Sequence, residues 1–312
     1  MKIPVGGIAF FDSGVGGLTV LDCCQKRFTN EKFYYFGDNE RAPYGNQPPD
    51  LIRRYVDESF SVFKQLEIKA VVLACNTVTA LCIDELRARY PFPIIGAEPA
   101  VVSAAKRGGE VFVLTTRATF NSTRFHALCA KVRLKYPQAH ITPYSCDGLA
   151  GGIEERLTDE FYDFTRFLPR GSPNAVVLGC THYLYIKEKI KNFYGCEVFD
   201  GNEGIAQRLY NQLARQNYAK KEETDGVKGK NLQRGRDGRP PVQKGCKKIG
   251  KIDHFLASNS KTGLIARNTN ECSRLKARKS LVISGIATKN EVYFLGSGAS
   301  KNKQFYERMF VF

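Results

Sequence analysis

The sequence predicts an α/β protein built from two similar, doubly wound parallel-sheet domains that are related by pseudo-symmetry. Short apolar segments alternate with helical stretches as far as about Tyr210, a pattern typical of parallel sheets covered on both faces. The phrase AVVLACNTVTA at residues 70–80 returns as AVVLGCTHYLY at 175–185. One series of strands and helices ends near Glu98 and Pro99, where a second begins. Two related domains with an active-site cleft between them explain this repetition.

The first series accounts for one sheet and its helices. Its apolar runs are short enough for buried strands, and apolar side chains recur near helical spacing after the polar loop NERAPYGNQPPD. We expect strands at 8–11, 32–36, 70–74 and 93–96, and helices at 18–24, 51–66 and 77–90.

The second series repeats the arrangement over residues 99–209, which we assign to the second domain. We expect strands at 111–114, 140–143, 175–178 and 197–199, and helices at 120–136, near 157–168 and at 185–193. Residues 1–98 and about 210–312 are assigned to the first domain.

The region after Gln212 differs in composition. Between residues 220 and 280 there are 17 Lys and Arg against 6 Asp and Glu, so this segment carries +11 of the net charge of +16. With few large apolar residues it predicts a flexible insertion, and nucleic acid is a candidate partner only through it. Strands are expected again at 281–283 and 292–295, followed by a helical tail at 303–309.

The composition indicates a globular protein of the cytoplasm. The 312 residues are 43% hydrophobic, which is enough for packed cores, and no window approaches 18 consecutive apolar residues. The N-terminus lacks the features of a signal peptide. Ten cysteines occur without a CxxC pair, so we expect reduced thiols, no structural metal and no membrane partner.

Polar groups follow three of the expected strands, at the edge where parallel sheets bind ligands. These groups are DSG at 12–14, CNT at 75–77 and CTH at 180–182. Each also lies at a helix entrance, where backbone N–H groups and the helix dipole favour an anion. A carboxylate ligand would fit there, and the same position favours the thiolate form of a cysteine.

Two thiols, Cys75 and Cys180, therefore suit one ligand held between two domains. One thiolate could remove a proton from one face of a carbon while the opposite thiol returns a proton to the other face, which is racemisation. Asp12, Glu154 and His182 could tune the pair. The two faces would be similar in geometry and unequal in proton affinity.

Other interpretations of these residues remain open but explain less. Either cysteine alone could be a small core residue at a strand end. The GVGG segment resembles part of a nucleotide-binding loop, but Thr19 occupies the third glycine position. A Cys/His pair for acyl transfer would leave the second cysteine unexplained.

The motifs FDSGVGGLTV, APYG, ACNT and GCTHY, in this order, resemble the cofactor-independent amino-acid racemases, and within them the glutamate racemases. The resemblance covers about residues 8–210 and, more weakly, 281 to the end. It implies interconversion of L- and D-glutamate without pyridoxal phosphate, metal or other cofactor, to supply D-glutamate for peptidoglycan, by a homodimeric isomerase.

The same resemblance implies roles for individual residues. Cys75 would take the α-proton of D-glutamate and Cys180 that of L-glutamate, assisted by Asp12, Glu154 and His182. The substrate would be held by a larger set: Asp12, Ser13, Tyr44, Gly45, Asn76, Thr77, Thr116, Thr119, Thr181 and His182.

Three features depart from the resembled family. Thr115 stands where glycine is usual, so a tight turn could be altered. Glu154 lacks the usual preceding Pro-Leu, which leaves Glu155 as an alternative. The basic insertion has no counterpart. A racemase for aspartate or a hydantoin is the nearest alternative function, and a nucleic-acid-binding protein on a racemase scaffold is the alternative from another class.

Overall fold

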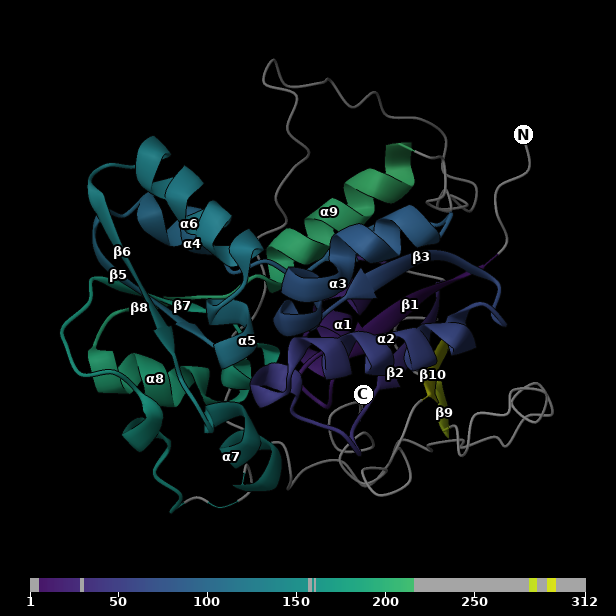
Figure 1. Cartoon of the computed structure of the whole chain (residues 1–312), viewed down its shortest axis with the longest axis horizontal. Helices are drawn as coiled ribbons and strands as arrows, with labels where there is room; N and C mark the ends of the chain where they lie inside the picture. The colour runs from purple at the N-terminus through teal and green to yellow at the C-terminus, as the bar shows by residue number, and fades with distance from the viewer. Residues whose placement is uncertain are drawn as a thin grey trace, which may run out of the picture. The chain divides into compact units, whose positions relative to one another are not determined.

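The computed structural model describes residues 6–28, 31–156, 159, 161–215, 281–284 and 291–295 (Figure 1). The described elements belong to one compact unit that contains two β-sheets. The basic segment at 220–280 and the expected helical tail at 303–309 lie outside the described residues. The predicted domain boundaries therefore stay a prediction, whereas the predicted two-sheet α/β architecture is confirmed.

The first sheet has six strands in the order β4-β3-β1-β2-β10-β9. Neighbours from β4 to β10 run parallel, and only the edge strand β9 is antiparallel to its neighbour. This edge strand corrects the expectation of a wholly parallel sheet. The strands are β1 (Gly7–Asp12), β2 (Lys32–Gly37), β3 (Ile68–Leu73), β4 (Ile94–Gly96), β9 (Leu281–Ser284) and β10 (Glu291–Leu295).

Both faces of this sheet are covered, as β1 shows by burying consecutive side chains on opposite sides. Ile8 and Phe10 pack with helices α1 (Leu18–Gln25) and α9 (Asn202–Arg215). Ala9 and Phe11 pack with α2 (Pro49–Phe63) and α3 (Asn76–Arg89). A strand buried on both faces needs an unbroken apolar run, which explains the sequence IAFF.

The second sheet has four parallel strands in the order β6-β5-β7-β8. Helices again cover both faces, with α4 and α6 on one and α7 and α8 on the other. The strands are β5 (Gly109–Thr115), β6 (Ala139–Ser145), β7 (Ala175–Leu178) and β8 (Glu197–Phe199). The helices are α4 (Val101–Ala105), α6 (Thr123–Lys135), α7 (Leu149–Arg156) and α8 (Lys187–Tyr194).

The predicted helix near 157–168 was wrong. The chain instead forms α7 earlier and a short 3-10 turn, η2 (Phe164–Phe167). Gly148 precedes α7 with a φ of 82°, and a Cβ on Gly152 would lie 3.1 Å from the hydroxyl of Tyr162. The positive φ of Gly148 favours glycine, and at Gly152 a larger residue would displace Tyr162.

Two further helices differ from the prediction. The segment 120–136 is divided into α5 (Arg117–Phe120) and α6, because Ser122 caps α6 by accepting a hydrogen bond from the backbone of Phe125 at 3.2 Å. The segment 185–193 begins earlier, as the 3-10 turn η3 (Thr181–Ile186) followed by α8. Helices α4 and α9, and the turn η1 (Tyr44–Asn46), were not expected.

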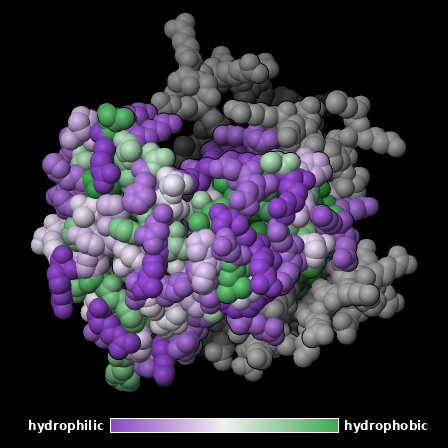
Figure 2. All heavy atoms as spheres, in the orientation of Figure 1, coloured by the Kyte–Doolittle hydropathy of each residue, from purple (hydrophilic) through white to green (hydrophobic). Residues whose placement is uncertain are grey.

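The surface of the described part is mainly hydrophilic on the side that Figure 2 shows, as expected when the apolar side chains are buried in the cores. On the face shown in Figure 2, hydrophilic atoms cover most of the described part and hydrophobic atoms appear in small groups. Within the described ranges, no helix has the length and apolar character needed to cross a bilayer.

Candidate active site

The two cysteines of the repeated phrase occupy equivalent positions in the two sheets. Cys75 lies two residues beyond β3 and directly precedes α3, and Cys180 lies two residues beyond β7 and directly precedes η3. Both side chains are buried, with 5% and 7% exposure. Each thiol thus lies at the carboxyl end of a parallel strand, where such sheets bind ligands.

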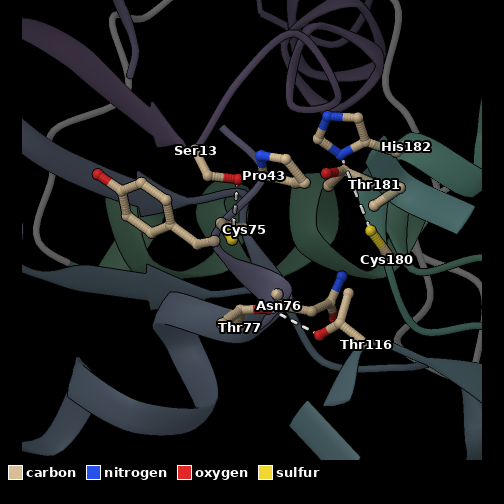
Figure 3. Close-up of a pocket in the computed structure, with 12 residues that line it drawn as sticks. Ser13, Pro43, Cys75, Asn76, Thr77, Thr116, Cys180, Thr181 and His182 are labelled. Carbon is tan, nitrogen blue, oxygen red and sulfur yellow. Dashed lines mark hydrogen bonds between the residues drawn. The ribbon is translucent and has the colours of Figure 1, made fainter. Parts of the chain in front are cut away.

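One pocket contains both thiols. Figure 3 shows the two sulfur atoms on different sides of it, each from the residue that directly precedes α3 or η3. The pocket is lined by Ser13, Pro43, Tyr44, Gly45, Cys75, Asn76, Thr77, Thr116, Ala150, Cys180, Thr181 and His182. Side chains from the two sheets therefore share one binding space.

Cys75 is surrounded by groups that keep its proton in place. Its sulfur lies 3.7 Å from the hydroxyl of Ser13. Burial and the charge of Asp12 raise the pKa of Cys75 to about 12, against the smaller lowering effects of the Val78 backbone and Ser13. These surroundings favour the thiol form of Cys75 at neutral pH.

Cys180 has a different partner. Its sulfur lies 3.8 Å from Nδ1 of His182, whose Nε2 lies 2.6 Å from a carboxylate oxygen of Glu154. Burial lowers the pKa of His182, but the Glu154 charge and the contact with Cys180 raise it well above its ordinary value. The structure thus brings Glu154 to the histidine, while Glu155 is exposed. A protonated imidazole beside Cys180 stabilises negative charge on that sulfur.

Asp12 lies behind the pocket wall and links its two sides. It is fully buried, accepts a hydrogen bond from the backbone N–H of Gly14 at 3.1 Å, and accepts another from the hydroxyl of Thr181 at 3.3 Å. Burial raises its pKa to about 6, although the charge of His182 and backbone hydrogen bonds lower it. Asp12 therefore changes charge close to neutral pH.

A cluster of threonine hydroxyls forms another part of the site. The hydroxyl of Thr77 lies 2.9 Å from that of Thr116, which in turn donates to Thr119 over 3.2 Å. Thr116 also caps α5. Thr119 supports the cluster without lining the pocket.

The unusual Thr115 causes no strained turn, because it is the last residue of β5. Its hydroxyl donates to the carbonyl oxygen of Tyr144 at 2.9 Å. A Cβ on Gly179 would lie 2.7 Å from the Thr115 methyl carbon. Gly179 therefore provides the space that this threonine occupies.

Glycines let the two halves of the site approach closely. A Cβ on Gly16 would lie 2.3 Å from the Thr181 hydroxyl and 2.9 Å from the His182 backbone nitrogen. A Cβ on Gly45 would lie 2.6 Å from Thr116. All three distances are shorter than real Cβ contacts, so the backbone itself is the surface that meets the opposite half.

Sequence reasoning did not identify four residues of this region. Pro43 and Ala150 line the pocket, and Asp38 with Arg41 form an ion pair beside it, with Arg41 Nε 2.6 Å from a carboxylate oxygen of Asp38. Asp38 directly follows β2, so the rule that identified Asp12 could also have identified it. In the described part of the chain, no group of three or more His, Cys, Asp or Glu could hold a metal ion.

Comparisons with known proteins agree with this geometry. A family model described as Asp/Glu/Hydantoin racemase matches residues 19–209. A glutamate racemase of Clostridium kluyveri is 37% identical over 220 residues, which are 67% of this chain and 84% of that protein.

Solved structures give the same result. A glutamate racemase isoform from Bacillus anthracis has a TM-score of 0.60 and 28% identity, and the match covers 69% of this chain and 84% of that one. The Escherichia coli glutamate racemase, in complex with L-glutamate and the activator UDP-MurNAc-ala, has a TM-score of 0.59 and 28% identity, with 67% and 83% coverage.

Proposed function

Because this chain belongs to the Asp/Glu/hydantoin racemase family, we propose that it is an isomerase that interconverts L- and D-glutamate. The observation that supports this function best is the pair of buried thiols, Cys75 and Cys180, which reach one pocket from two sheets. The relatives named above are glutamate racemases, and one of them was solved with L-glutamate.

The reaction exchanges the α-proton between faces of one carbon. A thiolate takes the proton, so the Cα–H bond breaks, an S–H bond forms, and the electron pair is delocalised into the α-carboxylate. The opposite thiol then donates its proton to the other face of Cα, and its sulfur becomes the thiolate. Cys75 removes the proton of D-glutamate and Cys180 that of L-glutamate. No electron acceptor or cofactor is needed for this balance.

The assisting groups act on one thiol each. The Glu154 carboxylate holds His182 in its protonated form beside Cys180. Asp12 acts on Cys75, because its charge raises the pKa of that thiol and its protonation removes the effect. The two half-reactions therefore use different chemistry to reach the same intermediate.

The substrate carboxylates meet helix entrances and hydroxyl groups. Asn76 and Thr77 form the first residues of α3, a helix of 14 residues whose N-terminus favours an anion. Residues from both halves complete the binding site: Asp12, Ser13, Tyr44, Gly45, Thr116, Thr119, Thr181 and His182. Thr119 acts by orienting Thr116, to which it is hydrogen-bonded.

The proposal extends to the setting of the enzyme. D-glutamate made here supplies peptidoglycan synthesis, as is typical of the family, and the enzyme acts as a cytoplasmic homodimer. Binding of nucleic acid by residues 220–280 remains a separate prediction, tested by comparing nucleic-acid binding of the whole chain with that of a chain lacking this segment.

The experiment follows the α-proton. With L-glutamate in deuterated water and no added cofactor, the protein should form D-glutamate that carries deuterium at Cα. Cys75→Ala and Cys180→Ala should each abolish racemisation, whereas Cys129→Ala, which removes a buried thiol of α6 outside the pocket, should retain it. Full activity in either pocket variant would exclude the two-thiol mechanism.

The same assay separates glutamate from the alternative substrates. Aspartate is one methylene shorter, so it cannot span the same pair of carboxylate contacts, and a hydantoin lacks the free carboxylates. We expect glutamate to be racemised with the highest kcat/KM of the three. A higher kcat/KM for aspartate or a hydantoin would reassign the substrate within the family.

A further inference from the structure

Asp38 is a buried carboxylate beside the pocket but outside its wall. It directly follows β2, and its side chain is fully buried. Its backbone N–H donates to the carbonyl oxygen of Asp12 at 3.1 Å. Asp38 is therefore fixed at the sheet edge that carries the reacting groups, although the pocket lining of this loop begins only at Pro43.

The Asp38 carboxylate joins both ends of the loop that follows it. It accepts a hydrogen bond from the hydroxyl of Tyr44, and Arg41 Nε lies 2.6 Å from the same carboxylate. The backbone N–H of Arg41 also donates to the Asp38 carbonyl oxygen at 3.1 Å. Burial and the charge of Asp38 raise the pKa of Tyr44 far above its ordinary value, so the phenol keeps the proton that it donates.

The outer side of the loop is anchored on α2. A guanidinium nitrogen of Arg41 lies 2.5 Å from a carboxylate oxygen of Glu58, and its carbon lies 4.2 Å from the ring centre of Tyr55. That ring is 5.6 Å from the ring of Tyr44. The carboxylate of Asp38 thus connects a rigid helix to the residue that enters the pocket wall.

The inner side of the loop reaches the other sheet. Pro43, Tyr44 and Gly45 line the pocket together with Cys75. The backbone at Gly45 lies so close to Thr116 that a Cβ would be 2.6 Å from it. A small displacement of Tyr44 would therefore alter both the pocket wall and the contact between the two halves.

We propose that Asp38 is a positioning residue for the racemase, which acts through Tyr44 to hold the segment 43–45 in the pocket wall and against Thr116. This inference rests on the proposed function, because it gives Asp38 a role in the binding of glutamate. The reacting thiols are not touched by Asp38, so its effect falls on substrate binding more than on proton transfer.

The test compares Asp38→Asn, Tyr44→Phe and the double variant. Asp38→Asn removes the negative charge that Tyr44 and Arg41 bind, and Tyr44→Phe removes the hydroxyl that donates to it. Loss of this charged hydrogen bond should raise KM for glutamate about tenfold, with kcat lowered less than about threefold. Because both changes break the same link, the double variant should be no worse than the worse single variant. Glu31→Gln is the matched control, since it breaks another buried ion pair, to Lys69 at 2.7 Å, away from the pocket. It should lower the melting temperature and leave KM unchanged.

A second measurement does not depend on turnover. Loosening of the segment 43–45 should expose Cys75, so iodoacetamide should alkylate it at least about fivefold faster in Asp38→Asn than in the unaltered chain or in Glu31→Gln. An unchanged alkylation rate, an unchanged KM or additive effects in the double variant would each overturn the role of Asp38. Absence of glutamate racemisation by the unaltered chain would instead overturn the proposed function, and the alkylation rates would still decide the role of Asp38.

Discussion

Thr181 donates a hydrogen bond to Asp12 over 3.3 Å, although Asp12 ends a strand of one sheet and Thr181 follows a strand of the other. Asp12 ends β1, and Thr181 directly follows Cys180. The charge of the same Asp12 raises the pKa of Cys75. The buried carboxylate of Asp12 thus contacts the neighbour of Cys180 and acts electrostatically on Cys75. Its protonation therefore changes interactions on both sides of the pocket.

Replacement of Asp12 by asparagine should change the dependence of stability on pH. The folded pKa of about 6 exceeds the ordinary value of 3.8, so the contribution of Asp12 is fully present below pH 3.8 and is lost as the pH rises through 6. The loss amounts to about 3 kcal/mol. Because asparagine stays neutral, the melting temperature of Asp12→Asn relative to that of the unaltered chain should rise between pH 4 and pH 8. The racemase activity of the variant should be lower than that of the unaltered chain.

The slope of this difference depends only on the folded pKa of Asp12, which already includes the effect of its hydrogen bonds, because asparagine does not titrate. A melting-temperature difference for Asp12→Asn that stays constant from pH 4 to pH 8 would contradict the raised pKa.

Alkylation of Cys75 should reveal a strongly bound proton. Burial and the charge of Asp12 raise its pKa to about 12, and only the thiolate reacts with iodoacetamide. The second-order rate constant should therefore increase from pH 7 to pH 10 without reaching a plateau. Mass spectrometry of the labelled peptide measures it separately for Cys75. A plateau below pH 9 would show that the thiol ionises much more easily than its surroundings in the structure imply.

Gly16→Ala should separate activity from stability. Its Cβ would lie 2.3 Å from the Thr181 hydroxyl and 2.9 Å from the His182 backbone, so η3 must move away from the first sheet. A shift of this size should reduce kcat about 100-fold, and the overpacking should cost about 1–3 kcal/mol. Activity assays and chemical denaturation measure the two effects.

The matched control for Gly16 is Gly204 in α9, around which a Cβ meets no atom within 4 Å. Gly204→Ala should stabilise the chain by about 0.5–1 kcal/mol, because alanine favours a helix, and should leave kcat unchanged. Normal activity of Gly16→Ala would mean that η3 tolerates displacement and that the close approach is not needed for catalysis.

The sequence was sufficient to locate the two thiols because their signal is local. A buried strand that ends in cysteine before a helix places the thiol at the sheet edge whatever the rest of the chain does, and the repeat at Cys75 and Cys180 doubled that signal. Helix α7, which directly follows Gly148 and contains Gly152, could not be located in the same way. Glycine disfavours a helix by propensity, and only packing against Tyr162 explains its presence in α7.

The link between Asp38 and Tyr44 was also beyond the sequence. The two residues are six positions apart in a loop, and their contact depends on a path that returns to the end of β2. Likewise, the contact of Glu154 with His182 needs the packing of α7 against η3. Interactions that depend on how irregular segments fold back need the three-dimensional structure, whereas the ends of regular strands do not.

Glu154→Gln should lower the pKa of His182 and weaken proton transfer at Cys180. Burial lowers this pKa, and the Glu154 charge at 2.6 Å is the largest effect that raises it. A folded pKa above the ordinary value of 6.5 contributes stability that is present below pH 6.5 and is lost as the pH rises through the raised value. The variant should therefore be less stable than the unaltered chain at pH 6, and this difference should shrink in alkaline solution. Titration of His182 by NMR measures the pKa, and kcat/KM should fall by the same factor for L- and D-glutamate, because the equilibrium constant between the two enantiomers is fixed. Glu155→Gln, at the exposed neighbouring position, should change none of these quantities, and an unchanged titration of His182 in Glu154→Gln would show that the carboxylate does not hold the imidazole proton.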